Sequence, residues 1–306
     1  MDKIVAIIVT YNRKQLLSIC LDAIVNQALK PVVAYIIDNA STDGTDEWVH
    51  ENGFDGVKSG IEFRYICLAE NIGGSGGFYT GMKMAYETND NFDAFWLLDD
   101  DGIAEAHQLE RLQVHLAECD YLSPLVVDKE NPHRISFGAK QTIQDFISQK
   151  GANNGVIHGV AFPFNGVLYS RKLVEQVGFP VKDMFIWGDE ANYHWRCVEN
   201  GHNPELVVDA VHVHPADRQV QETIIRNHNI VVPTPNWKLY CYVRNWMYNI
   251  KTVPSYRRYT VNPVRMLVWY FLYFTFYSFD WRRLGIVCRA MWDGFRKDLS
   301  RLDNYR

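Results

Sequence analysis

The sequence predicts an α/β fold built on a mostly parallel sheet, and two observations carry this prediction. Short apolar runs of strand length alternate with amphipathic stretches of helical period, which is typical of parallel strands joined by right-handed crossovers. Each run also ends in polar or glycine residues, and in such sheets ligands bind where the strands end. With 306 residues, 47% of them hydrophobic, the chain can form a sizeable core.

The individual elements follow from the spacing of the apolar residues. Strands are expected at residues 4–9, 32–37, 63–68, 94–99 and 206–213, with shorter strand-like pieces at 121–127, 135–138 and 160–169. Helices are expected at residues 16–24, 78–88, 171–177 and 189–200, the last of them closed by Gly201. The proline-containing stretch 215–235 is expected to be a loop.

Three adjacent aspartates, Asp99, Asp100 and Asp101, follow the strand expected at residues 94–99. Carboxylates at the end of a buried strand need a partner, because unpaired buried charge is very costly. A divalent cation such as Mg²⁺ or Mn²⁺ is a suitable partner, since it takes oxygen ligands and often bridges carboxylates to a substrate diphosphate. Taken alone, the triplet also fits a solvated acidic turn.

A glycine-rich stretch, Asn71–Gly77, lies between an expected strand and an expected helix. Glycines let the backbone approach a ligand closely, and the N-terminus of a helix favours an anion. The spacing of these glycines is not that of the dinucleotide-binding fingerprint. A plain flexible loop is the alternative interpretation.

Composition and charge narrow the possible environment of the chain. The six cysteines are scattered without a C-x-x-C pair, which argues against a disulfide framework or a zinc site and favours a reducing compartment. The N-terminus enters a strand-like run directly, so no signal peptide is expected.

The net charge is −5, yet residues 250–306 hold 11 Lys and Arg against 4 Asp and Glu. Such a basic tail predicts contact with an anionic surface, and a membrane is favoured over nucleic acid.

The basic tail also contains a cluster of aromatic residues between Leu267 and Phe279, with arginines on both sides. This run is too short to span a bilayer, which requires about 20 apolar residues. Aromatic residues flanked by arginines suit the headgroup layer of an anionic membrane. The alternative is a buried helix that packs on the catalytic domain or on a second subunit, as in a homo-oligomer.

Six motifs follow one another along the chain: VTYNR at residues 9–13, DNASTDGT at 38–45, NIGGSGGF at 71–78, DDD at 99–101, FNGVLYSR at 164–171 and FIWGDE at 185–190. Together they resemble the signature of family 2 glycosyltransferases, and most of all the bacterial galactofuranosyltransferase and rhamnosyltransferase branch. The resemblance covers about residues 4–250, and Tyr242–Asn245 is similar to an arginine–asparagine element that recurs in this branch.

The resemblance implies a GT-A fold, in which a Rossmann-like nucleotide half is joined to a mixed acceptor half; a C-terminal helical tail follows here. It implies inverting transfer from a nucleotide-diphosphate sugar to a hydroxyl group, with Mn²⁺ or Mg²⁺ bound at Asp99 and Asp101 as a Lewis acid. Thr10 and Asp38 are then expected at the nucleobase and ribose. The residues expected to bind the nucleotide sugar are Thr10, Asn12, Arg13, Asp38, Asn71, Gly73, Gly74, Asp99 and Asp100.

A second acidic pair, Asp189-Glu190, opens the helix expected at residues 189–200. Acidic residues in the first turn of a helix are favoured by the helix dipole, so this pair can be explained by helix stability alone. The resemblance implies that a carboxylate here accepts the proton of the acceptor hydroxyl. Counting back from Arg196 places Glu190 at the catalytic position and Asn192 where the family has a further acid. Glu190 is therefore expected to be the base and Asp189 to bind acceptor hydroxyls, with the reverse left open.

Two histidines, His212 and His214, alternate on the strand expected at residues 206–213, so both face the same side. They can be ordinary, partly buried histidines. The resemblance implies a metal-ligating histidine in this region, and imidazole suits Mn²⁺ beside carboxylates. His214, just before Pro215, is the first choice, and His212 is the alternative.

These features predict a metal-dependent hexosyltransferase with a catalytic domain at residues 1–249 and a tail at 250–306. The tail places the enzyme on the cytoplasmic face of the cell membrane or joins subunits. UDP-galactofuranose is the first expectation for the donor, with dTDP-rhamnose as runner-up, and a surface polysaccharide or lipid-linked glycan is the acceptor. A nucleotidyltransferase needs a basic triphosphate-binding loop, but residues 10–13 contain a single arginine. A carbohydrate-binding protein needs neither a metal site nor the acidic pair. No nucleic-acid partner is expected.

Overall fold

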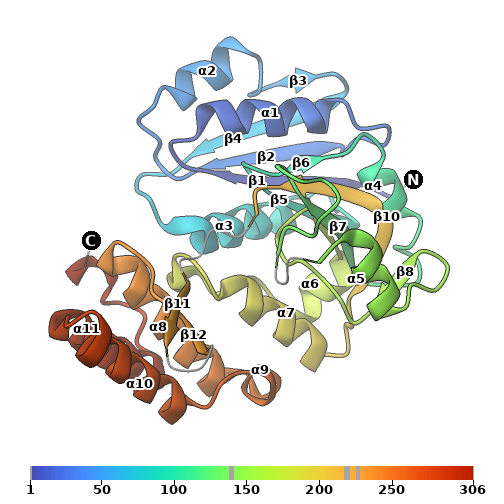
Figure 1. Cartoon of the computed structure of the whole chain (residues 1–306). Helices are drawn as coiled ribbons and strands as arrows, with labels where there is room; N and C mark the ends of the chain where they lie inside the picture. The colour runs from blue at the N-terminus through green and yellow to red at the C-terminus, as the bar shows by residue number, and fades with distance from the viewer. Residues whose placement is uncertain (1, 138–140, 217–220, 225–227, 306) are drawn as a thin grey trace. The chain divides into compact units, whose positions relative to one another are not determined.

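The computed structural model in Figure 1 describes residues 2–137, 141–216, 221–224 and 228–305. The chain divides into two compact units. The first unit contains Met1–Lys182 and Cys197–Asp217, and the second contains Asp183–Arg196 and Arg218–Arg306. The functional boundary expected at residue 249 stays a prediction.

The first unit is built on one large sheet whose strand order is β3-β4-β2-β1-β5-β9-β7-β10-β6, with β8 paired to β10. Strands β4, β2, β1 and β5 run parallel, as do β7 and β10, whereas β9 is antiparallel to both β5 and β7. The predicted α/β class, with a mostly parallel part followed by a mixed part, is therefore confirmed. The strands are β1 (Ile4–Thr10), β2 (Val33–Asp38), β3 (Val57–Lys58), β4 (Ile61–Cys67), β5 (Ala94–Asp99), β6 (Ile103–Ala104), β7 (Tyr121–Asp128), β8 (Val156–His158), β9 (Val167–Ser170) and β10 (Glu205–His214).

Helices cover both faces of the parallel part of this sheet. Figure 1 shows α1 on one face and α3 on the other, and all seven residues of β1 are buried as a result. This explains why the first strand is a continuous apolar run and not an alternating one. The helices of the first unit are α1 (Lys14–Val25), α2 (Thr45–Glu51), α3 (Gly73–Glu87), α4 (Gln108–Gln113), α5 (Ile143–Lys150) and α6 (Arg171–Val177).

The glycine-rich stretch is the beginning of helix α3, which starts at Gly73, five residues before the predicted start. Its interpretation as a flexible loop is therefore wrong for residues 73–77. A Cβ atom at Gly77 would lie 2.5 Å from Cγ1 of Val9, and one at Gly81 would lie 2.5 Å from Cγ2 of Ile7. These glycines let the helix lie directly against β1, so close approach to the sheet accounts for them.

Three other sequence predictions need correction. The strand expected at residues 160–169 begins only at Val167, and of residues 135–138 only Ile135 forms a β-bridge, to Val127; Gly138 lies outside the described residues. Part of the expected 215–235 loop forms an antiparallel hairpin of β11 (Gln221–Ile224) and β12 (His228–Val231). The prolines of this stretch flank the hairpin and so do not interrupt its hydrogen bonds. Residues 217–220 and 225–227 lie outside the described residues.

The second unit is helical apart from this hairpin. Its core packs aromatic and aliphatic side chains of α8, α10, η3 and α11, among them Tyr240, Tyr270, Phe274 and Val287. Within the residues that the structure describes, none of the helices combines the length and the apolar character needed to cross a membrane. The elements are η1 (Lys182–Met184) and α7 (Asp189–Glu199), both shared with the first unit, and α8 (Asn236–Thr252), α9 (Pro254–Tyr259), α10 (Pro263–Leu272), the π-helical η3 (Tyr273–Tyr277), α11 (Trp281–Phe295) and η4 (Leu302–Asn304).

Candidate active site

The carboxyl ends of strands β1, β2 and β5 meet at one edge of the sheet in the first unit. Thr10 pairs in register with Asp38, and Val9 pairs with Asp99. The hydroxyl of Thr10 donates a hydrogen bond of 2.8 Å to the carboxylate of Asp100. Parallel pairing thus brings three motifs that are far apart in the chain to a single edge, as expected for a ligand site in this class of fold.

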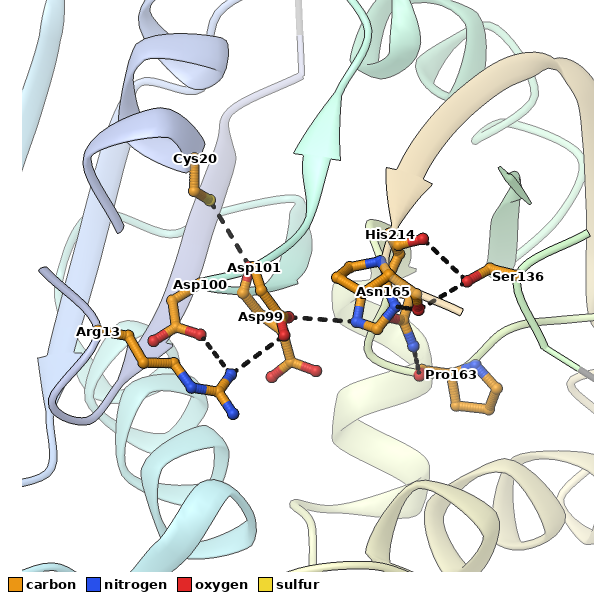
Figure 2. A network of polar contacts seen from close by, with 10 residues as sticks. Arg13, Cys20, Asp99, Asp100, Asp101, Ser136, Pro163, Asn165 and His214 are labelled. Atoms are coloured by element: carbon orange, nitrogen blue, oxygen red, sulfur yellow. Dashed lines mark hydrogen bonds and ion pairs between the residues drawn. The ribbon is translucent and has the colours of Figure 1, made fainter. Parts of the chain in front are cut away.

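Arg13 joins two of the aspartates. Its Nη1 lies 3.1 Å from an oxygen of Asp100 and 3.1 Å from an oxygen of Asp101 (Figure 2). Burial opposes the charge of Arg13, but the neighbouring carboxylates outweigh this effect and raise its pKa. Burial also raises the pKa of Asp100 to about 6, although Arg13 and Thr10 act in the opposite direction. This edge of the sheet therefore concentrates negative charge around the guanidinium of Arg13.

Asp99, Asp101 and His214 form a compact cluster, because one potential ligand atom of each lies within 4.8 Å of the others. Nδ1 of His214 lies 2.7 Å from the carbonyl oxygen of Pro215, which can only accept, so Nδ1 carries a proton. Ser136 donates hydrogen bonds to the carbonyl oxygens of His214 and Pro215 and so fixes this turn. Nε2 is left facing Asp101, at 3.2 Å (Figure 2).

The charge balance of this cluster suits a cation. Burial and the adjacent charge of Asp101 raise the pKa of Asp99 to about 7. Burial alone would also raise the pKa of Asp101, but the hydrogen bond and charge of His214, together with Arg13, lower it. Two carboxylates and an oriented imidazole form the mixed oxygen and nitrogen donor set that Mn²⁺ accepts. The residues present therefore fit a divalent metal ion.

His212 lies apart from this cluster. Its side chain is fully buried, and Nδ1 lies 3.0 Å from the amide oxygen of Gln108. Burial lowers its pKa to about 3. Cβ atoms at Gly102 or Gly166 would clash with its ring, so both glycines make room for it. Of the two histidines left open by the sequence, the structure brings His214 to the aspartates and packs His212 in the core.

The residues expected at the nucleoside form a connected loop structure. Asp38 is 1% exposed, and its carboxylate accepts hydrogen bonds from the backbone of Ser41 at 2.9 Å and from the Tyr65 hydroxyl at 2.6 Å. Asn12 accepts a hydrogen bond of 2.6 Å from the backbone of Thr42. The loops after β1 and β2 are thereby joined to each other, which gives Asp38 a fixed orientation.

The residues expected to approach the diphosphate lie at the beginning of α3. The amide oxygen of Asn71 accepts a hydrogen bond of 2.8 Å from the backbone of Gly73. A Cβ atom at Gly74 would have no neighbour within 4 Å among the described residues. The first turn of α3 therefore has space beside Gly74, and it carries the partial positive charge of a helix N-terminus.

Asp189 and Glu190 open helix α7 in the second unit. Asp189 is 5% exposed. The side chain of Glu190 lines a cavity of about 110 Å³ together with Trp187, Gly188, Ala191, Tyr242, Trp246 and Tyr256. Among the residues that the structure describes, none forms an ion pair or hydrogen bond with the Glu190 carboxylate. Of the two acids, Glu190 is the one that reaches an open, aromatic-walled space.

Comparison with known proteins gives the family of the chain. Residues 5–178, more than half of the chain, match the sequence profile described as glycosyl transferase family 2. The chain belongs to this family. It is therefore a glycosyltransferase, and the resemblance drawn from its motifs is confirmed.

Among curated proteins, this glycosyltransferase is similar to the galactofuranosyltransferase GlfT1 of Mycolicibacterium smegmatis (strain ATCC 700084 / mc(2)155). The two are 28% identical over 283 residues, which cover 89% of this chain and 90% of the relative. The galactofuranosyltransferase GlfT1 of Mycobacterium tuberculosis (strain ATCC 25618 / H37Rv) is also 28% identical, over 89% of both chains.

Solved structures share the fold of this glycosyltransferase. The mannosyltransferase PcManGT from Pyrobaculum calidifontis, in complex with GDP-Man and Mn²⁺, matches with a TM-score of 0.55 at 16% identity, over 94% of this chain and 74% of that chain. Residues 1–349 of S. aureus TarS, in complex with UDP, match with a TM-score of 0.56 at 13% identity, over 99% and 89%. These neighbours establish the GT-A fold.

Some residues that shape the site carry no clear signal in the sequence. Tyr65 reaches Asp38 from strand β4, and Ser136 supports His214 from an irregular segment. Trp246 and Tyr256 line the Glu190 cavity from α8 and α9, more than 50 positions along the chain from Glu190. Their roles depend on tertiary packing, which periodicity and local motifs do not encode.

Proposed function

We propose that this glycosyltransferase transfers galactofuranose from UDP-galactofuranose to a hydroxyl group of a surface polysaccharide or a lipid-linked glycan, with inversion at the anomeric carbon. The observation that carries the donor assignment is the similarity to the GlfT1 galactofuranosyltransferases over 89% of this chain. The Asp99–Asp101–His214 cluster at the end of β5 supports a diphosphate donor.

Asp99, Asp101 and His214 would hold Mn²⁺ or Mg²⁺ in this enzyme. A divalent ion neutralises charge on the leaving diphosphate and so acts as a Lewis acid. Arg13 holds Asp100 and Asp101 in place and contributes positive charge to the same edge. The free space beside Gly74 at the start of α3 suits the approach of an anionic diphosphate.

The nucleoside binds at Asp38 and Thr10 in this proposal. Tyr65 and Ser41 fix the Asp38 carboxylate, and Asn12 ties the two loops together. Because a fixed acceptor favours a ligand that offers hydroxyl donors, the ribose of a UDP sugar suits this position better than a deoxyribose. That preference separates UDP-galactofuranose from the alternative donor, dTDP-rhamnose.

Glu190 accepts the proton of the acceptor hydroxyl. At the same time, the oxygen of this hydroxyl bonds to the anomeric carbon, and the bond from the anomeric carbon to UDP breaks. Glu190 lines a cavity, and its carboxylate forms no hydrogen bond or ion pair with the described residues. Aromatic walls such as Trp187 and Tyr242 suit the apolar faces of a sugar ring. Asp189 binds acceptor hydroxyls from the same turn of the helix.

The C-terminal tail docks the enzyme on the inner face of the cell membrane in this proposal. Phe276, Phe279 and Trp281 are 61%, 74% and 58% exposed, and large exposed apolar groups mark a contact surface. The second unit also contains an apolar hollow of about 350 Å³, lined by Met247, Leu267, Cys288, Met291, Trp292 and Phe295. Arginines flank this aromatic run on both sides in the sequence, so we favour an anionic lipid surface over a second subunit.

A transfer assay with a panel of nucleotide sugars tests the proposed donor. The wild-type enzyme, supplied with Mn²⁺ and an oligosaccharide acceptor, is expected to release UDP from UDP-galactofuranose faster than it releases dTDP from dTDP-rhamnose. Faster turnover of dTDP-rhamnose would overturn the donor assignment. Formation of a nucleoside diphosphate sugar from a triphosphate would instead indicate a nucleotidyltransferase, and binding without turnover of any donor would indicate a carbohydrate-binding protein.

A further inference from the structure

The segment that leads into helix α7 has an unusual backbone. Phe185 and Trp187 have φ angles of 71° and 62°, and Gly188 follows with 83°. Left-handed conformations are costly for residues that carry a Cβ atom, and they persist only where the surroundings hold them in place. Since Glu190 follows within two residues of Gly188, whatever holds this segment also sets the position of the Glu190 carboxylate.

Asn245 of helix α8 makes three of the hydrogen bonds that hold the segment. Its Nδ2 lies 2.9, 3.0 and 2.7 Å from the carbonyl oxygens of Met184, Ile186 and Trp187. Its Oδ1 accepts a hydrogen bond of 3.0 Å from Nε of Arg244, which fixes the orientation of the amide. One fully buried side chain thus faces the backbone on both sides of Phe185.

Arg244 extends the same contact. Its Nη2 donates to the carbonyl oxygens of Met184 and Asp183 at 2.9 and 3.3 Å, and its Nη1 donates to that of Leu299 at 3.0 Å. The side chain is fully buried. Burying a guanidinium is costly unless its donors are satisfied. Backbone carbonyl oxygens satisfy the donors of this buried guanidinium. The conformation of residues 183–184 is therefore held in place by Arg244.

Asn249, one helical turn beyond Asn245, connects the segment to α7 itself. Its Nδ2 donates a hydrogen bond of 2.7 Å to the carbonyl oxygen of Gly188, and its Oδ1 accepts one of 2.9 Å from Nδ2 of Asn192. Asn192 in turn accepts a hydrogen bond of 3.0 Å from Nε of Arg196. A carboxylate at position 192 could not donate to Asn249. This pairing gives a physical reason for asparagine at the position where the family has an acid.

We propose that Arg244, Asn245 and Asn249, here called the α8 clamp, are positioning residues that hold the 183–188 segment so that Glu190 projects into its cavity. The inference rests on the proposed role of Glu190 as the base. Trp187 and Gly188 of the clamped segment line the cavity with Glu190. Tyr242 and Trp246, which lie on the same helix as the clamp, line it too. Helix α8 thus holds the segment that leads to the base and also contributes to the wall of the cavity.

Substitutions that keep the size of the clamp side chains but remove their donors test this inference. Asn249→Asp removes the donor to Gly188, and Asn245→Asp removes the donors to Met184, Ile186 and Trp187. Asn236→Asp is the matched control, because it makes the same chemical change at the first residue of α8. Glu190→Gln is measured in parallel. The quantities compared are kcat, the KM for UDP-galactofuranose, the Kd for UDP with Mn²⁺, the melting temperature and amide exchange over residues 183–192.

We expect both clamp variants to lower kcat by about 10- to 100-fold, the loss typical of a displaced catalytic group. The Kd for UDP and the KM for the donor are expected to stay within about 2-fold of the wild type, because the donor residues belong to the first unit. Amide exchange should rise over residues 183–192, and the control should match the wild type in every quantity. A change confined to kcat and local exchange separates positioning from a general loss of stability.

Folded clamp variants with wild-type kcat beside an inactive Glu190→Gln would overturn the inference and leave the proposed function intact. A loss of kcat accompanied by an equal loss of UDP affinity would also overturn it. A fully active Glu190→Gln would instead overturn the proposed base and the inference together. If Asn245→Asp does not fold, Asn249→Ser decides, because it removes only the bonds to Gly188 and Asn192.

Discussion

Nε2 of His214 lies 3.2 Å from a carboxylate oxygen of Asp101, although one residue ends strand β10 and the other follows strand β5. The hydrogen bond from Nδ1 of His214 to Pro215 turns the ring so that Nε2 faces the aspartates. An imidazole oriented by a backbone carbonyl is the usual arrangement of a metal-ligating histidine. The geometry therefore suits a metal site that includes Asp99 as a further ligand.

We predict that transfer requires a divalent metal ion held by these residues. Asp101→Ala and His214→Ala should each weaken Mn²⁺ binding at least about 10-fold, since even the loss of outer-shell partners of metal sites has effects of this size. Transfer should fall with metal occupancy, and the far-UV circular dichroism should be unchanged. Titration of Mn²⁺ followed by electron paramagnetic resonance measures the affinity.

The control for this prediction is Asp22→Ala, which removes an exposed carboxylate from helix α1. It should bind Mn²⁺ like the wild type. Full transfer activity in the presence of excess EDTA would contradict the requirement for a metal ion.

Local sequence patterns predicted the fold class and most of the strand ends of the first unit. Helices cover both faces of the sheet, so strands such as β1 and β5 are continuous apolar runs. Such runs could be recognised in the sequence. The beginning of α3 was missed, because Gly73–Gly77 disfavour a helix locally and are tolerated only where α3 packs against β1. The choice between His212 and His214 also needed the structure, since alternation gives both the same face and only packing buries His212 against Gln108.

We predict that UDP binds more tightly than dTDP and that Asp38 is responsible for part of this affinity. Asp38→Asn should weaken UDP binding about 10-fold, which corresponds to about 1.4 kcal/mol, because one acceptor oxygen becomes a donor. Isothermal titration calorimetry with UDP and dTDP, both with Mn²⁺, measures the difference. Tyr65→Phe is the companion variant, because it keeps the carboxylate but removes the 2.6 Å hydrogen bond that fixes it. Tighter binding of dTDP by the wild type would favour rhamnose as the transferred sugar.

We predict that Glu190→Gln abolishes turnover but retains donor binding. The amide has nearly the same shape as the carboxylate but cannot accept a proton, and a general base typically contributes about 10²- to 10⁴-fold to the rate. Release of UDP in the presence of acceptor measures the loss, and calorimetry with UDP measures binding. Asp189→Asn is the matched change on the adjacent, buried residue and should act mainly on the KM for the acceptor. An inactive Asp189→Asn beside an active Glu190→Gln would reverse the two roles.

We predict that burial of His194 makes the folded enzyme less stable in acid. Desolvation lowers the pKa of His194 from 6.5 to about 4, so the folded protein holds the neutral ring while the unfolded chain binds a proton below pH 6.5. The free energy of unfolding should therefore be unaffected by this residue above pH 6.5 and should fall as the pH decreases from 6.5 to about 4. The upper bound of the effect is roughly 3 kcal/mol, at about 1.36 kcal/mol per pKa unit.

Urea unfolding at a series of pH values measures this dependence, with His194→Gln as the comparison. The variant cannot titrate, so its free energy of unfolding should decrease less between pH 6.5 and pH 4 than that of the wild type. Equal slopes for the two proteins would show that His194 is not the group responsible.

The last prediction concerns the C-terminal tail and an anionic membrane. The guanidinium of Arg265 lies 4.4 Å from the Trp269 ring, and Phe279 and Trp281 are exposed beyond it. Each basic residue near an anionic surface contributes about 1 kcal/mol, so three or four engaged arginines are enough for reversible binding. Apolar burial of the exposed rings adds to this and does not depend on salt. Binding to anionic vesicles should therefore weaken as salt is added but should not vanish.

Co-sedimentation with vesicles of neutral and anionic lipids measures this binding. Replacing Arg282 and Arg289 by Gln should reduce binding to anionic vesicles and its dependence on salt, whereas Phe279→Ser should reduce the part that persists at high salt. Lys83→Gln on α3 is the control, since it removes an exposed positive charge outside the tail. Equal binding to both kinds of vesicle would remove the electrostatic part of the proposal. Absence of binding to either, together with a concentration-dependent rise in molecular mass, would assign the exposed rings to a contact between subunits.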